Sequence, residues 1–210
     1  MVYIYPIKSG DIERGNKREM REKMKNNTGF SLVELIIVIA IMAILAGAIA
    51  PALIRYIDKS RKSNDVTAAK TIKTAVETAL SYEKSFELLT TGDESSTTDA
   101  DGKTISYVGY IEIKPDVEYT GYGNHEIELI PADNAETESD SLENTSDEIA
   151  NNLGDKTPKI KYRKAANGTI KPTTWFVFCT TQGSISVGIG ESKDNGKFYL
   201  LAPDISKFYN

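Results

Sequence analysis

The 210-residue sequence is poor in the side chains that build covalent or metal-bound scaffolds. It has one cysteine, Cys179, and one histidine, His125. A single cysteine excludes an internal disulfide, so a fold of this chain must rest on its apolar core. The same shortage leaves little material for a zinc site or for a cysteine–histidine nucleophile pair.

Basic charge is scarce over most of the chain. The whole sequence has 25 lysines and arginines against 30 acidic residues. Residues 1–29 hold seven basic and four acidic side chains, which leaves 18 basic and 26 acidic residues for the remainder. A nucleic-acid-binding domain normally carries a basic face. This balance therefore argues against a nucleic-acid partner.

One long stretch has no charge at all. The twenty residues from Leu35 to Ile54 contain no Asp, Glu, Lys or Arg. As a helix they would be about 30 Å long, the thickness of the hydrocarbon core of a bilayer. We therefore expect one membrane span. Basic residues lie on both sides of it, at 17–25 and 55–62, so charge alone does not determine its orientation.

The segment before the span, residues 1–29, is polar and basic. An ordinary secretory signal has its cut site after the apolar segment and loses that segment on processing. Here the polar segment comes first, so a cut after Gly29 would leave the apolar run on the mature chain. Without a cut, the run would act as a signal anchor. Met1 and Met24 are alternative starts for this leader, and Met24 would give the leader MKNNTG.

Residues 29–34 read GFSLVE and lead directly into the apolar run. This segment resembles the N-terminus of type IV prepilins and pseudopilins, in which glycine, phenylalanine, Ser/Thr, leucine, a branched apolar residue and glutamate precede a long apolar stretch. The resemblance implies that a membrane prepilin peptidase cleaves between Gly29 and Phe30 and that the new amine of Phe30 is N-methylated. It also implies a cytoplasmic N-terminus, a single pass through the cytoplasmic membrane before assembly, and a cell-surface filament afterwards.

Two residues of this motif have physical reasons to be there. Gly29 lacks a Cβ, so the chain can enter a protease cleft in an extended form. Glu34 is costly, since an acidic group at the centre of a membrane helix costs about 3 kcal/mol and less at its edge. The resemblance supplies a partner for this charge, the Phe30 amine of a neighbouring subunit. The alternative is that Glu34 only marks the edge of the span.

A glycine and a proline interrupt the apolar helix. Pro51 cannot donate the hydrogen bond to the carbonyl of Gly47, four residues earlier. Such a pair makes a point where a helix can bend or lose its helicity. The resemblance implies that this region loses helicity in assembled pili, so Gly47 and Pro51 form a candidate hinge. A static kink is the alternative.

The sequence beyond the span predicts an α+β fold. An amphipathic helix is expected over residues 55–91, with its end near 90–92 and one apolar stripe. The residues of this stripe are Val66, Ala69, Ile72, Val76, Ala79 and Leu80. An antiparallel sheet should pack on the stripe as a pilin roll within residues 92–210. The expected divisions are a leader at 1–29, an assembly half of the helix at 30–54, an amphipathic half at 55–91, and this sheet region.

Within the sheet region, the pattern alternates between turn signals and apolar runs. Residues 93–103 are expected to form a polar loop, and residues 131–155, with eight acidic and no basic side chains, an acidic loop with a short helix at 146–153. The strongest hairpin signal joins 185–189 to 198–201. The expected strands are 105–113, 117–122, 126–130, 160–164, 175–180, 185–189 and 198–201.

No residue pattern in this region indicates catalysis. The sequence has no G-x-S-x-G elbow, and Cys179 is expected to be a small core residue. Glu191, Asp194 and Asn195 are weak candidates for a calcium site because their oxygens lie in one loop. We otherwise expect no metal and no cofactor.

Two functions are compatible with the sequence. The first is a structural subunit, a pilin or pseudopilin of a type IV pilus or a related secretion or competence filament, and not an enzyme. Its partners, by resemblance, are copies of itself and other pilins, the prepilin peptidase and methyltransferase, an assembly platform protein and an ATPase. The alternative is a membrane-anchored extracytoplasmic binding domain that acts as a monomer. The absence of a cysteine pair departs from the C-terminal disulfide loop of many Gram-negative pilins and favours a Gram-positive or pseudopilin-like member.

Overall fold

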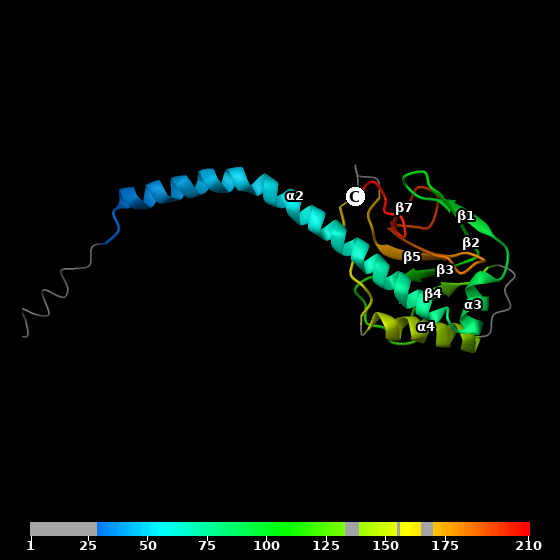
Figure 1. The fold of residues 1–210 in the computed structure, drawn as a ribbon. Coiled ribbons are helices and arrows are strands. Elements are labelled where there is room, and N and C mark those ends of the chain that lie inside the picture. The colour runs from blue at the N-terminus through cyan, green and yellow to red at the C-terminus, as the bar shows by residue number, and fades with distance from the viewer. Residues whose placement is uncertain (1–28, 133–138, 155, 165–169) are drawn as a thin grey trace, which may run out of the picture. The chain divides into compact units, whose positions relative to one another are not determined.

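The structure is a computed structural model that describes residues 29–132, 139–154, 156–164 and 170–210 (Figure 1). The chain divides into two units, Met1–Leu53 and Ile54–Asn210. Helix α2 (Leu32–Ala79) begins in the first unit and ends in the second.

In the first unit, every described residue is exposed, and the chain is helical from Leu32 onward. Helix α2 is the one helix in the described part of the chain that is long and apolar enough to cross a membrane, and its apolar window is nowhere buried. This agrees with the span that the sequence predicts.

The second unit contains an antiparallel sheet of five strands in the order β4-β3-β5-β6-β7 (Figure 1). A separate two-stranded sheet pairs β1 with β2. The predicted combination of a long helix and an antiparallel sheet, an α+β fold, is confirmed. The remaining elements are α3 (Glu83–Thr90), α4 (Ser139–Leu153), β1 (Ser95–Thr98), β2 (Thr104–Tyr107), β3 (Gly109–Ile113), β4 (Ile127–Ile130), β5 (Thr174–Cys179), β6 (Ile185–Gly190) and β7 (Phe198–Ala202).

Strand β5 is buried on both faces of the sheet. Trp175 and Val177 lie in the larger apolar cluster, which also contains the buried residues of α2. Phe176 and Phe178 alternate with them and lie in a second cluster, together with residues of β2 and β7. Because successive side chains of a strand point to opposite faces, a continuous apolar run fits a central strand covered on both sides.

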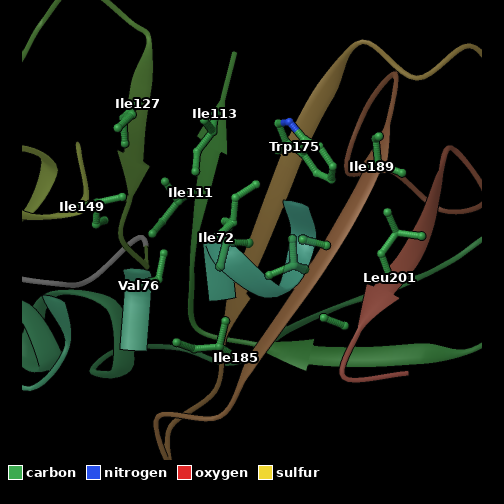
Figure 2. Close-up of a cluster of buried hydrophobic side chains, with 14 of the residues drawn as sticks. Ile72, Val76, Ile111, Ile113, Ile127, Ile149, Trp175, Ile185, Ile189 and Leu201 are labelled. Carbon is green, nitrogen blue, oxygen red and sulfur yellow. The ribbon is translucent and has the colours of Figure 1, made fainter. Parts of the chain in front are cut away.

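The apolar stripe of α2 packs on the first face of the sheet. Ile72 and Val76 are fully buried, and Figure 2 shows them beside Ile111 of β3, with Trp175 of β5 in the same cluster. Ala69 and Ala79 are also fully buried in this cluster. The stripe that the three- and four-residue spacing predicts is therefore confirmed.

The helix is shorter than the sequence predicts. Helix α2 ends at Ala79, and a separate helix, α3, begins at Glu83 and ends at Thr90. The amides of Ser81 and Tyr82 bond to carbonyls three residues back, at Thr78 and Ala79, which tightens the last turn. The expected end near Thr90 is right, but one continuous helix over 55–91 is wrong.

Most of the predicted acidic loop at 131–155 is helical. Helix α4 starts at Ser139, well before the short helix expected at 146–153. The buried face of α4 includes hydroxyl side chains as well as apolar ones. The three- and four-residue apolar spacing that indicates a helix is therefore incomplete in this segment. Thr145 and Ser146 are buried, and their hydroxyls bond to those of Ser85 (2.8 Å) and Tyr119 (2.9 Å). These hydrogen bonds make burial of the polar side chains possible.

Two predicted strands are absent from the described residues. Residues 160–164 form no strand, because the amides of Lys161 and Tyr162 donate to the carboxylate of Asp65 instead. Residues 117–122 make only an isolated bridge, between Glu118 and Lys156.

The strand at 105–113 is two strands, and the predicted loop at 93–103 contains one. Strands β2 and β3 are separated at Val108, where the chain passes from the small sheet to the large one. A Cβ on Gly109 would lie 2.9 Å from the side chain of Leu89, so glycine permits this close passage. The hairpin of β6 and β7 is confirmed, as are the strands at 126–130 and 175–180, within one residue at their ends.

Candidate functional site at the start of helix α2

The predicted cleavage pair lies just outside the helix. Gly29 and Phe30 are exposed and not helical, and α2 begins at Leu32. Phe30 is 85% exposed. A Cβ added to Gly29 would meet no atom within 4 Å. The described structure itself therefore has no steric need for glycine at this position.

Two side chains cap the start of the helix. The backbone N–H of Ser31 donates to Glu34 Oε2 (2.9 Å), and Ser31 Oγ accepts from the backbone N–H of Val33 (3.4 Å). This arrangement is a variant of the capping box, in which the hydroxyl of Ser31 accepts the amide of Val33 instead of that of Glu34, and both side chains satisfy amides that the helix leaves unpaired. The carboxylate also lies at the positive end of the helix dipole.

Glu34 therefore has a local role that the sequence analysis missed. The S-x-x-E pattern directly before an apolar run, at residues 31–34, is the signal that reveals it. The amide of Ser31 lies beyond the predicted cut, so this hydrogen bond does not require the leader. It occupies Oε2, and a carboxylate has about four acceptor positions.

The apolar residues that follow are uncovered. They lie on all sides of the helix, with Ile44 73% and Leu32 72% exposed. The burial of so many apolar side chains must come from surroundings outside the described chain, because contiguous exposed apolar surface of this size marks a membrane or protein contact.

The predicted hinge residues are helical in the structure. Gly47 and Pro51 both lie within α2, and a Cβ on Gly47 would meet no atom within 4 Å. The proline leaves the carbonyl of Gly47 without its usual helical partner. The hinge itself stays a prediction.

The three weak calcium candidates accept hydrogen bonds within the fold. Glu191 Oε1 accepts from the amide of Lys171 (2.7 Å) and Asn195 Oδ1 from the amide of Thr98 (2.9 Å). Asp194 Oδ2 accepts from the hydroxyl of Ser192 (2.7 Å). In the described ranges, no group of three or more His, Cys, Asp and Glu side chains could hold a metal.

Cys179 and His125 take ordinary positions. Cys179 is fully buried at the end of β5, and burial raises the pKa of its thiol to about 12. The thiol is therefore protonated and inaccessible at neutral pH, unlike a nucleophilic cysteine. His125 lies in an exposed turn, 3.5 Å from Glu128.

The chain therefore has an accessible Gly–Phe bond, a capped helix start and an exposed apolar first half of α2, followed by an α+β domain. Residues 24–50 match the family described as the prokaryotic N-terminal methylation motif. The chain carries the type IV prepilin signature, as the sequence predicts. The matched segment includes Gly29, Phe30 and Glu34, and it ends before the second unit. No solved structure matches the chain significantly. The motif indicates a pilin-like precursor with a structural role and processing by a prepilin peptidase.

Proposed function

We propose that this chain is the precursor of a pilin or pseudopilin, a structural subunit of a type IV pilus or a related secretion or competence filament. The peptidase cleaves after Gly29, Phe30 is N-methylated, and mature subunits polymerise through the apolar half of α2. A platform protein and an ATPase drive this assembly. The single observation that carries the proposal is the prepilin motif at the start of helix α2, whose apolar residues are all exposed as far as Ile54.

The capping box explains where the cut occurs. A protease binds its substrate in an extended form, and a helical peptide would first have to unfold. Because Ser31 and Glu34 set the start of the helix, Gly29 and Phe30 stay outside it and accessible. A Cβ on Gly29 would meet no atom of the described chain, and we attribute the need for glycine to the cleft of the peptidase.

Glu34 acts twice in this scheme. In the precursor it caps its own helix through Oε2. After cleavage, its remaining acceptor positions bind the positively charged amine of Phe30 from a neighbouring subunit. This amine does not exist before the cut, so the pairing of charges makes assembly depend on processing.

A substitution at Gly29 tests the proposal. Gly29→Val should leave the leader attached and abolish filaments, because the branched side chain obstructs the extended chain in the cleft. The measurement is the size of the protein in membranes on a gel, together with electron microscopy of sheared filaments. A matched control, Gly47→Val, adds the same bulk to another exposed glycine of the segment and should still be cleaved. Normal processing of Gly29→Val would contradict the proposal and favour a monomeric membrane-anchored binding domain.

A further inference from the structure

Five basic side chains line one hollow on the second unit, and we call this group of side chains the basic collar. Its lining has no acidic residue, and the one other side chain there is Ile160. All five cations are exposed. The collar consists of Arg61, Lys159, Lys161, Arg163 and Lys164.

The collar is held in place by a buried carboxylate. Asp65 is fully buried and accepts the amides of Lys161 (2.6 Å) and Tyr162 (2.8 Å). Ile160 is also buried. These contacts fasten residues 160–164 to α2, so that cations from two distant parts of the sequence lie together.

The surrounding acids compensate only part of this charge. Asp58 pairs with Lys164 (2.7 Å) and lies 4.0 Å from Arg61, and Asp116 pairs with Lys159 (2.5 Å). Arg55, Lys59 and Lys62 add positive charge along the adjacent face of α2. The collar therefore has an excess of positive charge that favours an anionic ligand.

The collar lies close to the end of the apolar run. The run ends at Ile54, and Arg61 follows seven residues later on the same helix, about 10 Å along its axis. The headgroup layer on each side of a bilayer is about 5–8 Å thick. Tyr56 is 72% exposed, and with α2 in the membrane as proposed it would lie at the interface, where aromatic residues gather in membrane proteins.

We propose that the basic collar binds the phosphate groups of anionic lipids at the membrane surface where the domain emerges. This rests on the part of the proposed function that places α2 in the membrane, and not on cleavage or assembly. It explains why basic residues follow the span as well as precede it, against the usual bias toward one side. Each cation near an anionic surface strengthens binding by about fivefold.

Chemical labelling of lysines in the uncut, full-length chain tests this proposal. Single chains are placed in nanodiscs of phosphatidylcholine, with or without phosphatidylglycerol, and acetylation of each lysine is followed by mass spectrometry. Lys159, Lys161 and Lys164 should react at least about fivefold more slowly with phosphatidylglycerol present. Lys171 and Lys197, exposed and outside the collar, should not change. Added inorganic phosphate should not reproduce the protection.

A pair of variants separates the collar from general charge. Arg61→Gln with Arg163→Gln removes two collar cations and should abolish most of the protection. Lys171→Gln with Lys197→Gln removes two cations elsewhere and should leave the collar lysines protected. Equal acetylation in both kinds of disc would overturn the proposal. Protection found only in filaments, and in neither disc, would assign the collar to an acidic surface of a neighbouring subunit and would leave the proposed filament function intact.

Discussion

The two units of this chain differ in whether their apolar side chains are buried. In the unit 54–210, the sheet is covered on both faces, and Ile72 and Trp175 are fully buried. In the described part of the first unit, Phe30 and Ile44 are exposed to 85% and 73%. The first pattern is that of a self-contained domain. The second belongs to a segment whose stability depends on a membrane or on neighbouring helices.

The largest expected effect concerns Glu34, the charged residue at the start of the exposed apolar segment. Glu34→Gln keeps the capping hydrogen bond, because an amide oxygen also accepts, but it removes the charge. Glu34→Leu removes both. Both variants should be cleaved, and filament yield should fall about tenfold or more, because the Phe30 amine of the neighbour is left unpaired in an apolar setting. The measurement is the amount of sheared filament per cell.

The contrast between these variants assigns the role of Glu34. If Glu34→Gln assembled like the wild type while Glu34→Leu did not, capping would be the function of Glu34. The pairing with a neighbouring amine would then be wrong.

The next effect contrasts two isoleucines, one in each unit. Ile72→Ala should lower the free energy of unfolding of the domain by about 2–5 kcal/mol, because it leaves a cavity in a fully packed core. Ile44→Ala should change it by less than about 0.5 kcal/mol. Denaturation of the full chain in detergent, followed by the fluorescence of the buried Trp175, measures both. Similar losses for the two variants would remove the distinction between the units.

A smaller effect is a dependence of stability on pH within the domain. Burial raises the pKa of Asp65 from 3.8 to about 6, against the opposing effect of the two amides that it accepts. A carboxyl with a raised pKa takes up its proton more readily in the folded state, so its contribution to stability is present below pH 3.8 and is lost as the pH rises to about 6. The difference in stability between the wild type and Asp65→Asn should therefore change across this window. A constant difference between pH 4 and 6 would show that Asp65 does not titrate in this way.

Sequence patterns predicted the elements that are held in the core by apolar side chains alone. The stripe around Ile72 and the run at 175–180 needed no information beyond spacing and composition. The elements that the sequence analysis missed depend on polar contacts between distant residues. Helix α4 buries Thr145 against Ser85, and Asp65 takes the amides of residues 161–162 away from strand pairing.

The same difference applies to the candidate sites. Gly29, Phe30 and Glu34 lie in one local segment, and the family match over 24–50 confirms the prepilin signature there. The basic collar joins residues about a hundred positions apart, so no local pattern reveals it. The capping role of Glu34 could have been recognised from the serine three residues earlier.

Mass spectrometry of the N-terminal peptide from the mature protein in membranes or filaments tests the central claim most directly. The account predicts a chain that begins at Phe30 and carries one methyl group on its amine. A chain that retains Gly29 and the residues before it, in cells that contain an active prepilin peptidase, would contradict the account.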